Sequence, residues 1–177
     1  MAKLLSHAAE RAAGLLKRHD RHVVLAESCT GGLVSAALVQ VPGVSTHYCG
    51  SAVVYQLATK ARWLGVSAAL LHHPGPVSRE VVAAMAEGVL RTTPHADLSA
   101  AVTGHLGPDA PPEQDGLVYI ALAERVPGSN GEPRTVLFRE EWFPDESDGR
   151  TTRIKRQFAV AERVLVTLAD FLESVCA

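Results

Sequence analysis

The chain has 177 residues, of which 47% are apolar and 20% are charged, which fits one domain with a sizeable core and excludes a disordered chain. Its 17 Lys and Arg residues nearly balance its 19 Asp and Glu residues, so we expect no large basic face and no nucleic-acid partner. No apolar run reaches the length of a membrane span, so we expect a cytoplasmic protein without a membrane partner, folded as a single domain over residues 1–177.

The first half of the chain alternates helical and extended patterns. Apolar residues recur near helical spacing from residue 3 onward, and Lys17 and Arg18 suit the last turn of that helix. Ser78 precedes another helical pattern as its cap, with Glu80 in the first turn. In this half we expect strands over 22–27 and 48–55, and helices over 3–19, about 30–41, 56–64, 67–73 and 79 to about 92.

The second half of the chain is richer in strands. Apolar runs predict strands over 98–103, 117–123 and 135–143, and a broad apolar stripe predicts a last helix from about 150 to 174. The turn residues at 127–131 predict that the last two strands pair in antiparallel orientation, so we expect a mixed sheet. The alternation of strands and helices predicts one α/β domain with helices on both faces of the sheet.

The stretch LAESCTGG, residues 25–32, lies at a turn from a strand into a helix. The first amides of a helix have no internal partner and favour anions and developing oxyanions, so a catalytic role is open. From these residues alone a structural role is favoured: Ser28 or Thr30 caps the helix, while Gly31 and Gly32 allow close packing. The chain contains no Gly-x-Ser-x-Gly, P-loop or dinucleotide-binding motif.

The cysteines and histidines give no pattern for a metal site. Cys29, Cys49 and Cys176 cannot all pair, and none has the spacing of zinc ligands, so we expect free thiols. His105 follows a strand but has no partner at ligand spacing, so we interpret it as an exposed loop histidine in preference to a new polar contact. We therefore expect no bound metal.

Several separate segments carry a family resemblance. They are Ala26–Gly32, Tyr55 followed by Lys60, Leu64–Val66, Val77–Val81, Ala84–Gly88, and Val102–Gly104 followed by Gly107 and Pro108. With these segments in this order along nearly the whole chain, the sequence resembles the C-terminal domain family of the competence/damage-inducible protein CinA. The amidohydrolase members of that family are nicotinamide mononucleotide deamidases.

The resemblance implies both a fold and an activity. The fold is a three-layer α/β/α sandwich with a mixed, mostly parallel sheet, and a homodimer is the family-level expectation. The activity is hydrolysis of the carboxamide of nicotinamide mononucleotide to nicotinic acid mononucleotide and ammonia, in pyridine-nucleotide salvage. The resemblance implies no metal and no other cofactor, and the expected partner is a small nucleotide substrate.

The resemblance also assigns catalytic residues. It makes Ser28 the nucleophile and Lys60 its base, with Tyr55 beside them and Thr103 lining the site. A serine hydroxyl is a poor nucleophile until a base takes its proton, and a lysine kept neutral by burial can do so. Cys29 is then expected to pack between helix and sheet as a small apolar residue.

The resemblance also implies substrate-binding residues. Amides around Thr30, Gly31 and Gly32 are expected to hold the tetrahedral oxyanion. The family places a phosphate-binding arginine near the start of the last helix, which makes Arg150 the first choice and Arg153 the second. The alternative is that both arginines lie on a solvated helix face.

Two segments depart from the family pattern. Residues 56–60 read Gln-Leu-Ala-Thr-Lys where the family has Ser-Asn-Glu-Ala-Lys, and residues 105–110 read His-Leu-Gly-Pro-Asp-Ala where it has Ile-Ala-Gly-Pro-Gly-Gly. These changes favour an alternative function, a divergent domain that binds a nucleotide-like ligand or a protein partner without hydrolysis. The presence of both Ser28 and Lys60 favours the amidohydrolase.

Overall fold

The computed structural model describes residues 2–125, 130–144 and 149–175, with the backbone alone at 149–151. Its helices are α1 (Ala2–Arg18), α2 (Leu33–Leu38), α3 (Leu57–Leu64), α4 (Ala68–His72), α5 (Arg79–Arg91) and α6 (Gly149–Val175). Its strands are β1 (Val23–Glu27), β2 (Tyr48–Val53), β3 (Leu98–Gly104), β4 (Leu117–Arg125) and β5 (Pro133–Trp142), and short 3₁₀ turns η1 (Val44–Thr46) and η2 (Pro112–Gln114) lie between them. Among the described residues, no helix combines the length and the apolarity needed to cross a bilayer.

The five strands form one mixed sheet in the order β2-β1-β3-β4-β5. β1 pairs in parallel with both β2 and β3, whereas β4 is antiparallel to β3 and to β5. Four strands therefore point the same way, which confirms the predicted mixed, mostly parallel sheet. The carboxyl ends of β1, β2 and β3 meet at one edge of the sheet, where open α/β sheets place their ligands.

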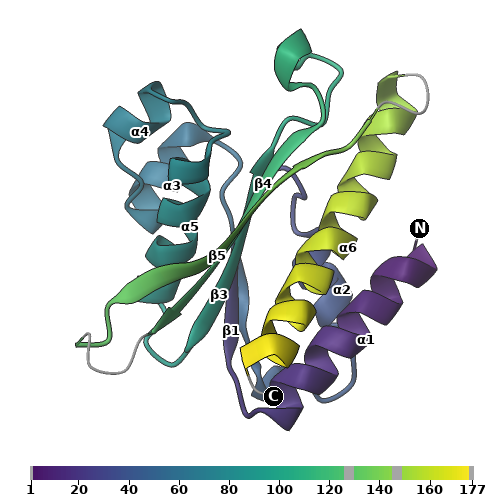
Figure 1. The fold of residues 1–177 in the computed structure, drawn as a ribbon, viewed down its shortest axis with the longest axis vertical. Coiled ribbons are helices and arrows are strands. Elements are labelled where there is room, and N and C mark those ends of the chain that lie inside the picture. The colour runs from purple at the N-terminus through teal and green to yellow at the C-terminus, as the bar shows by residue number, and fades with distance from the viewer. Residues whose placement is uncertain (1, 126–129, 145–148, 176–177) are drawn as a thin grey trace.

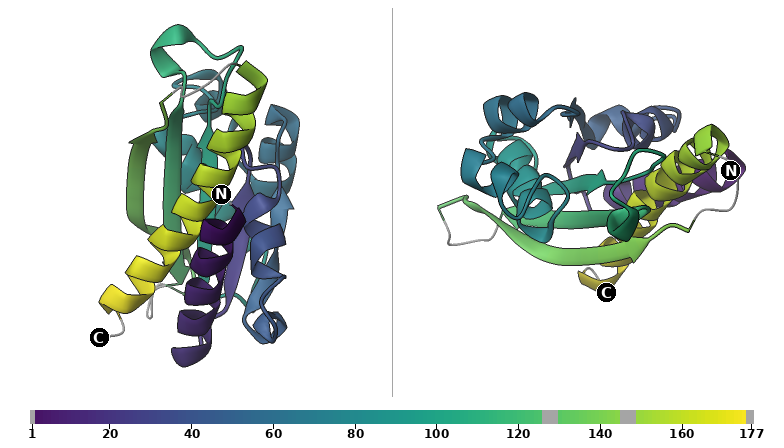
Figure 2. Two further views of the ribbon diagram at one scale, coloured as in Figure 1. Left: turned by 90° about the vertical axis from the view of Figure 1, so that its right-hand side faces the viewer. Right: turned by 90° about the horizontal axis from the view of Figure 1, so that it is seen from above.

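Helices cover both faces of the sheet, as the alternating pattern predicts (Figures 1 and 2). α1, α2 and α6 lie on one face, and α3, α4 and α5 lie on the other. Alternate residues of β1 supply the two cores: Val23 and Leu25 join the first, and Val24 and Ala26 join the second. β1 is buried along its whole length because it is covered on both faces.

Every expected helix and strand is present, and the boundaries differ most at α2. The pattern predicts a helix over about 30–41, but α2 has six residues. Gly31 and Gly32 precede it with φ values of 63° and 99°, a left-handed conformation that glycine adopts without a steric cost. The two glycines therefore belong to the turn, and the helix begins at Leu33.

Gly88 allows α5 to approach α3 closely. A Cβ at this position would lie 2.0 Å from the carbonyl oxygen of Leu64, the last residue of α3. Gly14 in α1 is different, because a Cβ there would meet nothing within 4 Å. The close approach matters for function because α3 and α5 carry Lys60 and Met85, which meet in the pocket described below.

We expect Gly88→Ala to lower the free energy of unfolding by about 1–3 kcal/mol, because the added methyl group forces the two helices apart. Gly14→Ala is the matched control and is expected to raise it by up to about 1 kcal/mol through helix propensity alone. Urea unfolding of the two variants measures both effects. An equal gain in both variants would show that the α3–α5 contact tolerates a side chain at Gly88.

Candidate active site

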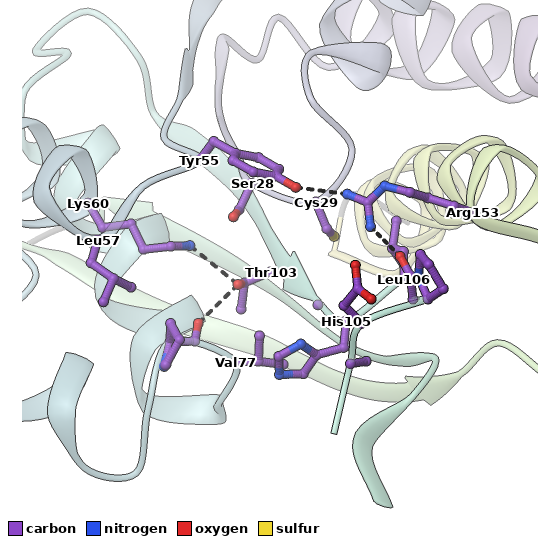
Figure 3. A pocket seen from close by; sticks show the side chains of 16 residues that line it. Ser28, Cys29, Tyr55, Leu57, Lys60, Val77, Thr103, His105, Leu106 and Arg153 are labelled. Atoms are coloured by element: carbon purple, nitrogen blue, oxygen red, sulfur yellow. Dashed lines mark hydrogen bonds between the residues drawn. The ribbon is translucent and has the colours of Figure 1, made fainter. Parts of the chain in front are cut away.

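A pocket of about 510 Å³ opens at the carboxyl ends of β1 and β3, next to the first turns of α6 (Figure 3). It is the size of a small-molecule site. Five residues expected from the sequence line it: Ser28, Tyr55, Lys60, Thr103 and Arg153. The other lining residues are Cys29, Leu57, Pro76, Val77, Gly104, His105, Leu106, Gly107, Pro108, Asp109 and Ala110.

Lys60 is a buried lysine, with only 2% of its surface exposed. Its Nζ donates to the hydroxyl oxygen of Thr103 over 3.3 Å and to the sulfur of Met85 over 3.2 Å. Burial disfavours the charged ammonium and lowers the pKa of Lys60 from 10.5 to about 8. A substantial fraction of the side chain is therefore neutral at a mildly alkaline pH.

The contacts around Lys60 match a neutral amine. The Thr103 hydroxyl donates its own proton to the Pro76 carbonyl over 3.0 Å, so it faces Lys60 as an acceptor. A neutral amine has two N–H bonds and one lone pair, and Thr103 and Met85 accept from both N–H bonds. In this neutral form the lone pair occupies the remaining position on the nitrogen, which neither contact uses. The sequence does not predict this contact of Met85, because a methionine on the apolar face of a helix is typical of a core residue.

Ser28 begins the turn directly after β1. Its amide donates to the Val102 carbonyl over 3.1 Å, which ties the turn to β3, and the residue is 7% exposed. Figure 3 shows its hydroxyl pointing into the pocket on the same side as the Lys60 amine. Within the described part of the chain the hydroxyl has no hydrogen-bond partner, and it does not cap α2.

Glu27 caps α2 instead. Its buried carboxylate accepts from the amides of Gly32, Val34 and Ser35 over 3.0, 3.2 and 2.9 Å, and from the Thr30 hydroxyl over 2.8 Å. These are the amides that a helix leaves without an internal partner. The sequence pattern pointed to a serine or threonine cap, because a glutamate that ends a strand is not the usual capping residue.

The turn residues after Cys29 lie away from the pocket. Thr30, Gly31 and Gly32 do not line it, and the Gly31 amide donates to the Ser28 carbonyl over 3.1 Å. Gly31 and Gly32 therefore have no free amide to offer an oxyanion in this arrangement. The Thr30 amide has no acceptor among the described residues.

Cys29 packs in the core between the sheet and the helices α2 and α6, as expected for a small apolar side chain. It is 3% exposed, and burial raises the pKa of its thiol to about 12. Although it borders the pocket, it stays a thiol at neutral pH, and the thiol is a much weaker nucleophile than the thiolate. Cys49 is also a free thiol, and Cys176 lies outside the described residues.

Arg153 brings a positive charge to the pocket from α6. Its guanidinium donates to the Gly107 carbonyl over 2.6 Å and to the Tyr55 hydroxyl over 2.8 Å, which fixes its position (Figure 3). Tyr55 lies at the rim, 60% exposed. The first-choice arginine, Arg150, has its backbone in α6, but its side chain lies outside the described residues.

The loop after β3 forms the opposite wall of the pocket. Arg156, 4% exposed, holds the loop through two parallel hydrogen bonds to Asp115 of 2.8 and 2.9 Å. His105 is half-buried and lines the pocket, so the expectation of an exposed loop histidine is wrong. Burial lowers its pKa, which keeps the imidazole neutral at pH 7.

We expect Lys60→Met to stabilise the fold. The pKa of Lys60 is about 8 in the folded state and 10.5 in the unfolded state, so wild-type stability rises with pH through this interval. At pH 7 a methionine avoids the cost of burying the charge, which is up to about 3 kcal/mol. Urea unfolding at pH 7 should show the gain, which should shrink towards zero above pH 10.5. A gain of the same size at both pH values would assign it to packing instead of charge burial.

Comparison with known proteins identifies the family. The family model described as CinA C-terminal domain matches residues 5–137. A CinA-like protein of Geobacter metallireducens is 44% identical over 116 residues, 64% of this chain and 28% of that protein. A CinA-like protein of Prochlorococcus marinus is 48% identical over 111 residues, 62% of this chain and 26% of that protein. The chain thus spans little more than a quarter of these curated relatives.

Solved structures match over nearly the whole chain. The competence/damage-inducible protein CihA of Agrobacterium tumefaciens has a TM-score of 0.80 and 31% identity, with 93% of each chain covered. A CinA superfamily protein of Klebsiella pneumoniae has a TM-score of 0.82 at 24% identity, with 96% of this chain and 98% of that chain covered, and supports the fold. From the sequence match and the shared fold together, the chain belongs to the CinA C-terminal domain family.

Proposed function

We propose that the chain is an amidohydrolase that converts the carboxamide of nicotinamide mononucleotide to a carboxylate and releases ammonia. The observation that carries this proposal is the buried Lys60, whose pKa is lowered to about 8, in one pocket with the hydroxyl of Ser28. Burying a lysine costs stability, and a pKa brought close to the working pH is what a general base requires.

The first half of the reaction makes an acyl-enzyme. Neutral Nζ of Lys60 takes the proton of Ser28 as Oγ adds to the carboxamide carbon, and the carbonyl oxygen becomes an oxyanion. When the tetrahedral intermediate collapses, the C–N bond breaks and Lys60 gives its proton to the leaving nitrogen, which departs as ammonia. The nicotinoyl group is then an ester of Ser28.

The second half releases the acid. Lys60, neutral again, takes a proton from a water molecule as the water oxygen adds to the ester carbon. Collapse of this second intermediate breaks the ester bond, and the proton returns to Ser28 Oγ. The products are nicotinic acid mononucleotide and the enzyme in its starting state, so no cofactor is needed.

The oxyanion needs donors that are not already used. Because the Gly31 and Gly32 amides donate to the Ser28 carbonyl and the Glu27 carboxylate, and Thr30 does not line the pocket, we assign the role to the amide of Cys29, which borders the pocket directly after Ser28. Positive charge held on Lys60 in the intermediate adds to the stabilisation, in a pocket where burial keeps electrostatic interactions strong.

Arg153 is the residue to which we assign the substrate phosphate. Tyr55 and Gly107 accept two of its five N–H bonds, so three remain for phosphate oxygens. The two contacts already hold the guanidinium at the pocket, so little entropy is lost when a phosphate binds. This arrangement makes a mononucleotide a better substrate than the corresponding nucleoside.

A binding function without hydrolysis is the second candidate. The hydrogen bonds of Lys60 favour it. Among the described residues, Nζ donates to Thr103 and Met85, and no hydrogen bond joins it to Ser28 Oγ. A ligand would then occupy the same pocket without being attacked.

Ammonia release measured beside a thermal-shift titration separates the two functions. We expect nicotinamide mononucleotide to raise the melting temperature and to release ammonia, and nicotinamide riboside to do both more weakly. Release should increase with pH through about 8, because only neutral Lys60 is a base. A melting shift without ammonia at any pH would establish the binding function instead.

We expect Ser28→Ala to lower ammonia release by at least about a thousandfold, because no other group can form the ester. Cys29→Ala is the matched control, one residue along the same turn, and should keep most of the activity because its thiol is buried and protonated. Single-turnover assays of both variants measure the difference. An inactive but folded Cys29→Ala beside an active Ser28→Ala would make the enzyme a cysteine amidase.

A further inference from the structure

A cluster of metal-ligating side chains lies at the end of the sheet opposite the pocket. Asp20 and His22 lie in the turn from α1 into β1, and His47 directly precedes β2, the parallel neighbour of β1. In Figure 1, α1 runs down to the lower end of the sheet, where β1 begins. Because β1 is five residues long, the cluster lies about 15 Å or more from Ser28, which follows the other end of the strand.

The three side chains converge on one point. One ligand atom from each of Asp20, His22 and His47 lies within 4.8 Å of the other two. The two imidazole rings are 5.5 Å apart between centroids and inclined by 43°, so they are not stacked flat on each other. A tetrahedral Zn²⁺ with bonds of about 2.0 Å holds its ligand atoms about 3.3 Å apart, a distance that small side-chain rotations would reach.

His47 supplies an independent observation that points to a ligand site. Its Nδ1 is buried and has no hydrogen-bond partner among the described residues. A buried ring nitrogen without a partner is costly, and polar atoms of this kind need an explanation. Neutral imidazole nitrogens are common metal ligands.

Asp97 contacts His22 and supports its position. Its carboxylate lies 3.6 Å from His22 Nδ1, accepts the His22 amide over 3.0 Å, and is itself held by Arg21. A carboxylate next to one nitrogen of a histidine orients the ring and leaves the other nitrogen for a metal. A hydrogen bond between these two atoms, which a small rotation of the His22 ring would form, is the usual support of a histidine that binds zinc.

We propose that Asp20, His22 and His47 bind a divalent transition-metal ion, with Zn²⁺ as the best match to two imidazoles and one carboxylate. Water completes the coordination, because Asp20 is exposed. The ion ties the α1–β1 turn to the start of β2. Its role is to stabilise the fold, since the cluster lies far from the pocket.

Zinc titration of the tag-free protein tests the proposal. Calorimetry should show one Zn²⁺ per chain and a rise in melting temperature. His22→Ala, His47→Ala and Asp20→Ala should each weaken binding by more than about tenfold, and Asp97→Asn by about tenfold or more. His7→Ala, an exposed histidine of α1, is the matched control and should bind as the wild type does. Circular dichroism checks that each variant is folded.

Cys49→Ser tests a competing ligand that lies two residues after His47 in the chain. We expect Cys49→Ser to retain binding, and ammonia release in wild type to be the same with and without Zn²⁺. Absence of stoichiometric binding, unchanged affinity in the three ligand variants, or loss of binding in Cys49→Ser would overturn the proposed ligand set.

Discussion

The buried amine of Lys60 is the constraint on which the pocket depends. A lysine can be buried only if its polar end finds partners and its neutral form is accessible. Met85 and Thr103 supply the partners, and Thr103 can accept because the Pro76 carbonyl takes its proton. The close approach of α3 and α5 at Gly88 brings these groups into range. Packing between two helices thus buries one nitrogen and lowers its pKa.

The fold was predictable because its signals are local and periodic. Strand alternation, helical apolar stripes and turn residues located every helix and strand and the mixed sheet. Within the site, the family resemblance singled out Lys60, which by itself has the appearance of a surface lysine. Glu27 as a cap and Met85 as a lysine partner were missed, because each depends on contacts that only the folded chain makes. The half-buried position of His105 could not be predicted for the same reason: the loop that buries it is held by Arg156, far along the chain, through Asp115.

The loop after β3 keeps a defined shape despite its departures from the family pattern. Its glycines at 107 and 116 remain where a side chain would collide, at 107 with Asp115 and Arg156 and at 116 with the Phe143 carbonyl. Two arginines of α6 hold it from the same helix, Arg153 through the Gly107 carbonyl and Arg156 through Asp115. The changed residues, His105, Leu106, Asp109 and Ala110, lie at the pocket wall. They alter the surface that a ligand meets and leave the anchors in place.

The Glu27 carboxylate occupies the helix start that a substrate anion would otherwise use. In many α/β proteins the turn after the first strand offers its helix start to a phosphate. Here the buried Glu27 carboxylate already accepts from those amides. A phosphate would have to displace this side chain and would be repelled by its negative charge. We therefore expect the proposed substrate to bind in one orientation. In the proposed reaction the substrate phosphate is directed to the α6 side of the pocket, and the opposite side, next to Ser28, is left for the uncharged carboxamide.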